Sequence, residues 1–356
     1  MKEKNTFAVV VGILSIVASV IVSAIVASRT ARSTSERFLK ECLGREGGGG
    51  IHQKTLDLKL AHSLPTTHPV HKGMVYMAKE LEKISGGEMK ITIFPNEQLG
   101  KETVIISKLQ RGEIALGKTS AAAMEGFAPI MGVFSLPYIF KDSKHYWKVL
   151  DGKIGGEILD ATLDKGLKGL CYYDAGARSF YCRSRMIESP ADLAGLQVRV
   201  MKSPTACEMV KLMGGIPTPM SFGELYSALQ SGRVDAAENN PPSFLSSKHC
   251  EVCKFYSLDE HARIPDILMV SKKVWDSLTG QQREWLLKAA KASSLFQREL
   301  WAKATKEDLE ALVKNYGVKI ARPDKKTFAK ACQPMYDKLE GTEMGKIVAR
   351  IKALGE

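Results

Sequence analysis

The stretch from Thr279 to Tyr316 limits the possible folds more than any other part of the chain. It contains no proline, and no glycine after Gly280, while apolar residues such as Trp285 and Leu309 recur along it. This pattern predicts one very long helix, or two nearly continuous ones. A helix of that length is too long for a single small domain, so the 356 residues are more consistent with two domains than with one.

The first half of the sequence alternates between strand and helix patterns. Residues 55–61, 89–94 and 113–118 read as strands, and residues 68–85 and 102–111 between them have the spacing of apolar residues typical of helices. The order is therefore strand, helix, strand, helix, strand. We expect an α/β fold with a parallel sheet and right-handed crossovers.

Residues 112–120, GEIALGKTS, match the phosphate-binding pattern G-x-x-x-x-G-K-[ST]. A phosphate-binding loop follows a strand and precedes a helix, because the helix N-terminus must face the phosphates. Here Gly112 instead follows a helix, and Gly117 and Lys118 end the next strand. Nucleotide hydrolysis stays a distant alternative, and we expect a Lys118→Ala change to leave ligand binding intact.

The second half contains further polar motifs next to predicted elements. Residues 189–200, SPADLAGLQVRV, predict a turn, one helical turn and a strand, and the S-x-x-E sequence at 221–224 predicts the start of a helix that ends at Gly232. Residues 234–240 precede Pro241 and Pro242. We expect the two prolines to stop regular structure, so that the preceding polar residues lie at a strand end.

The N-terminal region predicts export. Lys2 and Lys4 precede an uncharged run from residue 7 to 27, so residues 1–27 are either a cleaved signal peptide or an uncleaved membrane anchor. Residues 28–51 are polar and glycine-rich, as in a flexible linker. The predicted localisation is periplasmic or otherwise extracytoplasmic.

Charge and cysteine content suggest no further partner. The net charge of +12 is not accompanied by a basic run interleaved with aromatic residues, so we expect a solvated basic surface and no nucleic-acid partner. Cys250 and Cys253 form one C-x-x-C motif, with His249 and His261 nearby. A metal or redox site there is an alternative, but buried or incidental cysteines are favoured.

Several longer motifs resemble one transporter family. The chain resembles the extracytoplasmic solute-binding proteins of TRAP transporters, the DctP-like family, from about Leu56 to the C-terminus. The segments that carry the resemblance are FPNEQLG (94–100), FSLPYIF (134–140), GARSFY (176–181), SPADLAGLQVRV (189–200) and GGIPTPMSFGELYSALQSGRVDAAENNPPS (214–243).

The resemblance implies a two-lobed, periplasmic-binding-protein-like α/β fold with a hinge and a long lobe-spanning helix. It places the first lobe at residues 52–175 plus 265–304 and the second at 176–264 plus 305–356. It also implies capture of an organic acid and delivery to the membrane permease subunits of a TRAP transporter. No catalytic step, cofactor or metal is expected.

The resemblance also implies ligand-binding residues. Arg199 would clamp the ligand carboxylate, which suits the planar fork of a guanidinium. Arg178 matches a second ligand-facing arginine, and Asn239 matches an asparagine that binds the same carboxylate, whereas Asn240 would serve the turn. The weaker ligand-binding candidates are Phe222, His62, Ser63, His261, Glu102 and Ser120.

The stretches RSFY (178–181) and ENNPPS (238–243) resemble the branch of the family that binds sugar acids. The expected ligand is therefore a uronate, D-glucuronate or D-galacturonate. A four-carbon dicarboxylate is the alternative. It would need a second positive clamp, which Arg178 or Lys101 could provide.

Overall fold

The computed structural model describes residues 55–356, so the expected signal or anchor (1–27) and linker (28–51) lie outside the described residues. A first sheet has five strands in the order β2-β1-β3-β10-β4. These strands are β1 (Leu56–Ala61), β2 (Met89–Phe94), β3 (Leu116–Ser120), β4 (Leu167–Tyr173) and β10 (Asp266–Ser271). The expected parallel pairing is confirmed, because β1 runs parallel to both β2 and β3. Between β3 and β4 lies β10, which is antiparallel to both.

A second sheet has six strands in the order β11-β9-β5-β8-β6-β7. Its strands are β5 (Arg178–Cys182), β6 (Gln197–Val200), β7 (Ile216–Pro219), β8 (Ala236–Asn239), β9 (Phe255–Ala262) and β11 (Lys319–Ala321). The chain crosses between the sheets after β4 and again between β9 and β10. The expected two-lobed α/β architecture is confirmed by these two sheets, whereas the residue boundaries of the lobes stay predictions.

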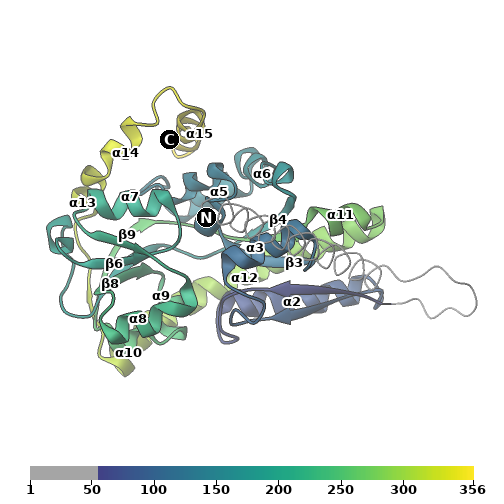
Figure 1. Cartoon of the computed structure of the whole chain (residues 1–356), viewed down its shortest axis with the longest axis horizontal. Helices are drawn as coiled ribbons and strands as arrows, with labels where there is room; N and C mark the ends of the chain where they lie inside the picture. The colour runs from purple at the N-terminus through teal and green to yellow at the C-terminus, as the bar shows by residue number, and fades with distance from the viewer. Residues whose placement is uncertain (1–54) are drawn as a thin grey trace, which may run out of the picture. The chain divides into compact units, whose positions relative to one another are not determined.

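Helices surround both sheets. Figure 1 shows α7 to α10 around β6 and β8, and α2, α3 and α11 around β3 and β4. The helices are α2 (Pro69–Ile84), α3 (Glu102–Arg111), α4 (Ala121–Met124), α5 (Ser143–Leu150), α6 (Lys153–Asp160), α7 (Pro204–Leu212), α8 (Leu225–Ser231), α9 (Pro241–Ser246), α10 (His249–Val252), α11 (Lys272–Ser277), α12 (Gly280–Tyr316), α13 (Lys325–Ala331), α14 (Gln333–Asp337) and α15 (Glu343–Ala353). Short 3-10 helices span Pro129–Ser135, Leu163–Lys165, Pro190–Leu193 and Phe222–Glu224.

The predicted long helix is confirmed as one continuous helix of 37 residues, α12. Thr279 caps its N-terminus by accepting a hydrogen bond from Gln282 N, and Gly317 ends it with φ of 64°. The helix packs mainly on α2 and also contacts β4 of the first sheet and helices α9 and α10, which follow β8 of the second sheet. In its middle, the hydroxyl of Ser294 donates to Tyr172 O at 2.6 Å and fixes the helix to the end of β4.

The phosphate-loop pattern is not in a phosphate-binding context. Gly112 ends α3 with φ of 76°, and Glu113 N donates back to Lys108 O at 2.9 Å. This closed helix end keeps residues 113–115 out of the strand. The strand therefore begins at Leu116 rather than at Glu113, and Lys118 is buried within it.

Pro241 and Pro242 correct a second prediction, because they do not end regular structure but begin helix α9. Proline is tolerated in the first turn of a helix, where the missing N–H would have no intrahelical acceptor. The Asn240 side chain caps this helix by accepting a hydrogen bond from Ser243 N at 2.8 Å. The polar residues before the prolines do end a strand, β8, as expected.

None of the helices between residues 55 and 356 combines the length and the apolar character that crossing a membrane requires.

Candidate functional site

The candidate site is a partly open cavity at the ends of strands from both sheets. Ser63 follows β1, Ser120 ends β3, Arg199 lies in β6 and Asn239 ends β8. The lining residues are Ser63, Leu64, Glu102, Lys118, Ser120, Ala175, Arg178, Arg199, Met201, Phe222, Asn239, Asn240, Ser243, Ile264 and Asp266.

Seven of the nine predicted ligand-binding residues line this cavity. They are Arg199, Arg178, Asn239, Phe222, Ser63, Glu102 and Ser120. Their positions are compatible with the predicted ligand contacts, which stay predictions.

Arg199 is a buried cation with one free donor atom. Its side chain is 1% exposed, and its Nε and Nη2 donate to Met220 O at 3.2 and 2.9 Å. Among residues 55–356, its Nη1 has no hydrogen-bond partner. Burial lowers the pKa of Arg199, but a guanidinium stays charged at any physiological pH. The cavity wall therefore presents an unneutralised positive charge.

Asn239 presents a second donor beside Arg178. The Asn239 Oδ1 accepts from Arg178 Nη1 at 2.8 Å and from Asn240 N at 3.0 Å. These two donors fix the orientation of the amide, so its Nδ2 is left available to a ligand. Arg178 itself is neutralised by Glu238, which accepts hydrogen bonds from its Nε and Nη2.

His261 does not line the cavity but lies behind its wall, and its predicted contact with the ligand stays a prediction. It is fully buried, with its Nδ1 2.7 Å from Asp259 Oδ2 and its Nε2 3.5 Å from Glu238 Oε2. Burial opposes the charged imidazole, but Asp259 and Glu238 outweigh it and raise the pKa of His261 to about 9. Its position assigns it to the support of Glu238 and, through Glu238, of Arg178.

His62 does not line the cavity either, and its predicted ligand contact likewise stays a prediction. It is fully buried, its Nδ1 accepts from Leu64 N at 3.1 Å, and its Nε2 lies 3.0 Å from His71 Nδ1. Burial, together with the charge of Lys118, lowers the pKa of His62 to about 2. Both ring nitrogens of the neutral imidazole are thus engaged by the protein in this structure.

Two lining residues, Lys118 and Asp266, were missed by sequence reasoning. Lys118 Nζ donates to Asp266 Oδ1 at 3.0 Å and lies 3.5 Å from Glu102 Oε1. The expectation that Lys118→Ala leaves binding intact does not fit this position in the cavity wall. A lysine within the fully buried strand β3 was the available signal, but its partner Asp266 is 148 positions away.

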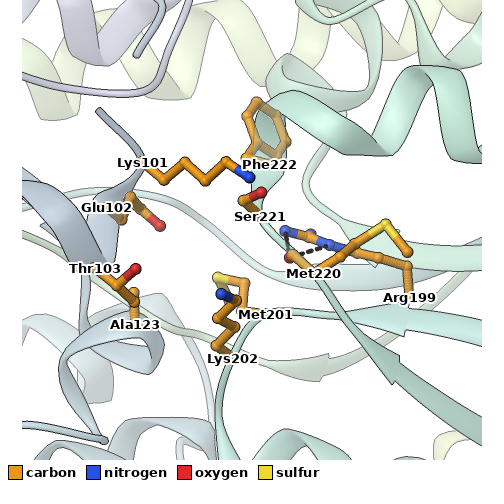
Figure 2. A pocket seen from close by; sticks show the side chains of 10 residues that line it. All are labelled: Lys101, Glu102, Thr103, Ala123, Arg199, Met201, Lys202, Met220, Ser221 and Phe222. Atoms are coloured by element: carbon orange, nitrogen blue, oxygen red, sulfur yellow. Dashed lines mark hydrogen bonds between the residues drawn. The ribbon is translucent and has the colours of Figure 1, made fainter. Parts of the chain in front are cut away.

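A smaller adjoining cavity shares Glu102, Arg199, Met201 and Phe222 with the first. Figure 2 shows Lys101, Glu102 and Thr103 on one side of it and Arg199, Ser221 and Phe222 on the other.

Two contacts connect the opposite sides of this smaller cavity. Lys101 Nζ pairs with Glu224 Oε1 at 2.6 Å, and Gly223 N donates to Glu97 Oε1 at 3.2 Å. The loop between β2 and α3 thus touches the 3-10 helix Phe222–Glu224 beside the cavity.

The C-x-x-C motif lies outside the cavity. Cys250 and Cys253 are buried free thiols in a cluster with Leu225 and Val318. Burial raises the pKa of both thiols, to about 11 for Cys250 and further for Cys253. Within residues 55–356, no group of three metal-binding side chains comes together. The environment of these thiols is typical of core residues rather than of reactive cysteines.

Comparison with known proteins places this architecture in one family. The sequence profile of DctP, bacterial extracellular solute-binding protein family 7, matches residues 60–342. A TRAP periplasmic solute-binding protein from Bradyrhizobium, solved in complex with α/β-D-galacturonate, is 39% identical, has a TM-score of 0.81 and covers 83% of this chain and 99% of its own. A similar protein from Chromohalobacter salexigens, solved with bound D-glucuronate, is 34% identical with a TM-score of 0.81 and covers 83% and 99% of the two chains.

A curated relative has a sugar acid in its name. The 2,3-diketo-L-gulonate-binding periplasmic protein of Escherichia coli is 32% identical over 70% of this chain and 76% of its own length. The family profile, these identities and the shared fold agree. This chain is therefore a member of the DctP family of bacterial extracellular solute-binding proteins.

Proposed function

We propose that this protein captures a uronate, D-glucuronate or D-galacturonate, outside the cytoplasm and delivers it to the membrane permease subunits of a TRAP transporter. The observation that carries the proposal is the unpaired Nη1 of Arg199 in a cavity that Asn239 also lines. A carboxylate placed there would receive charge-assisted hydrogen bonds in a buried site. The sugar acids bound by the similar proteins support the same ligand class.

Charge pairing disfavours the dicarboxylate alternative. A second ligand carboxylate would need another free cation, but Arg178 is neutralised by Glu238 and Lys101 pairs with Glu224. Of the described cations that line the larger cavity, Arg199 alone has no acidic partner. One carboxylate and several hydroxyl groups therefore fit the cavity better than two carboxylates.

The nucleotide alternative is disfavoured by the same kind of argument. The lysine of the phosphate-loop pattern, Lys118, faces Asp266 and Glu102. These two carboxylates would repel a phosphate at the place where the pattern requires one.

A thermal-shift screen of organic acids, followed by calorimetry, tests the proposal. A ligand that binds only the folded state adds about 2.7 kcal/mol to the free energy of unfolding at a hundredfold excess over its Kd. Both uronates should be tested beside succinate, malate and the neutral sugars glucose and galactose, which lack the carboxylate. Stabilisation by a uronate but not by a neutral sugar is expected. Stabilisation by succinate or malate without any effect of either uronate would refute the uronate assignment.

A further inference from the structure

The cavity wall opposite the free guanidinium atom contains a compact charged cluster, which we call the Lys118 cluster: Lys118, Asp266 and Glu102. Strands β3 and β10 bring the first two together, because Asp266 pairs with Ser120 and Leu268 with Lys118 in antiparallel register. Lys118 and Asp266 are thus diagonal neighbours on one face of the sheet. Glu102 begins helix α3 and is held by a hydrogen bond from Ser120 N at 2.9 Å.

The three side chains of the Lys118 cluster carry unequal charge. One ammonium lies 3.0 Å from Asp266 Oδ1 and 3.5 Å from Glu102 Oε1, so two carboxylates share one cation. All three side chains are at most 14% exposed, and all three line the cavity. With all three side chains ionised, this wall has one negative charge in excess, whereas Arg199 on the other wall has no acidic partner among residues 55–356. The cavity is therefore electrically polarised from end to end.

The atoms of the Lys118 cluster suit hydroxyl groups. A hydroxyl donates one hydrogen bond and accepts others, so it can donate to a carboxylate oxygen and accept from the ammonium at the same time. Lys118 Nζ has three N–H bonds for its two carboxylate neighbours, and one remains for a ligand oxygen. A second ligand carboxylate has no hydrogen to donate, and it would meet the excess negative charge directly.

We propose that the Lys118 cluster is a hydroxyl-recognition subsite that binds neighbouring hydroxyl groups of a sugar acid and rejects ligands with a second carboxylate. This proposal rests on the proposed function, since it assumes that the one ligand carboxylate lies at Arg199. Specificity arises from both effects, because discrimination depends on repelling the competitor as well as on binding the preferred ligand.

The unmodified protein provides the first test. D-Glucarate has the C2–C5 configuration of open-chain glucuronate but has a carboxylate at both ends and forms no pyranose ring, so the change in affinity ratio in the variants below isolates the effect of charge. Calorimetry should show glucarate binding at least about thirtyfold more weakly than glucuronate, since the second carboxylate would lie unpaired beside Asp266 and Glu102. Equal affinities would overturn the proposal. Absence of glucuronate binding would instead contradict the proposed function, so the two failures are distinguishable.

The second test removes the excess negative charge. Asp266→Asn keeps the shape of the side chain, and Lys118 can still pair with Glu102. We expect the variant to bind glucuronate about 10- to 100-fold more weakly, and the ratio of glucarate affinity to glucuronate affinity to rise at least about tenfold. Asp337→Asn is the matched control, because Asp337 is exposed on α14, and it should leave both affinities unchanged.

Glu102→Gln is an independent test of the Lys118 cluster, because it removes the negative charge of the other carboxylate, at the start of α3. The same change in affinity ratio is expected, and circular dichroism establishes that each variant is folded. Folded variants with the affinity ratio of the wild type would overturn the proposal. If neither variant folds, the glucarate measurement on the unmodified protein still decides.

Discussion

Replacement of Arg199 by methionine should abolish tight binding without weakening the fold. The guanidinium is 1% exposed, two of its nitrogens hold Met220 O, and its Nη1 has no partner among residues 55–356. A bound carboxylate would lose its buried counter-charge in the variant. Removing one member of a buried ion pair costs about 3–5 kcal/mol, which is roughly a 100- to 4,000-fold increase in Kd.

The ligand-free variant should behave in the opposite way. In the absence of ligand, the buried charge of Arg199 has no acidic partner in the described structure, so it opposes folding. Arg199→Met should therefore melt at the same temperature as the wild type or higher. Arg199→Lys keeps the charge but not the planar fork. It should cost about 2–4 kcal/mol of binding, because one ammonium must replace contacts to both Met220 O and the ligand.

Calorimetry and thermal melting together measure these effects. Lys202→Met is the matched control, because Lys202 is an exposed cation beside the smaller cavity, and it should change Kd by less than about fivefold. An Arg199→Met variant that binds a uronate within threefold of the wild type would remove Arg199 from the site. Lost binding accompanied by a large fall in melting temperature would show a structural role instead.

Three further predictions concern other groups. Burial lowers the pKa of His62 to about 2, so between pH 6.5 and 2 the imidazole takes up a proton only in the unfolded chain. His62 should therefore lower the free energy of unfolding by about 2 kcal/mol when the pH falls from 7.5 to 5. Urea titrations should show a smaller fall for His62→Gln, and an equal fall would contradict the assignment. Lys101→Met should raise Kd by no more than about fivefold, because Lys101 and Glu224 are 43% and 44% exposed; a larger loss in calorimetry would favour a second ligand carboxylate at Lys101. Chelator and reductant should leave the uronate Kd unchanged, and a large loss with either would make Cys250 and Cys253 functional.

The sequence predicted those elements whose pattern is local. The limits of α12 follow from the absence of helix breakers between Gly280 and Gly317, and β1 follows from its alternating leucines. The prediction that regular structure stops at Pro241 was wrong, because a proline can begin a helix as well as interrupt one. In each of these cases, neighbouring residues determine the outcome.

The ion pairs of the site could not be predicted from local sequence patterns. Lys118 and Asp266 meet only because β10 lies next to β3, and no local pattern records that pairing. Arg178 matched a ligand-facing residue, but its neutralisation by Glu238 depends on the pairing of β5 with β8. Whether a cation is free or already paired decides its role, and that property is set by contacts between distant segments.

The position of β10 also has a consequence for the order of synthesis. A ribosome completes β3 and β4 well before β10, yet in the finished sheet β10 separates them and supplies a hydrogen-bonding partner to each. At about 5–20 residues per second, the emerging chain waits on the order of 5–20 seconds with both of those edges open. The first sheet therefore closes late in translation, and until then the nascent chain exposes one open edge of β3 and an unpaired β4 to chaperones or to other chains.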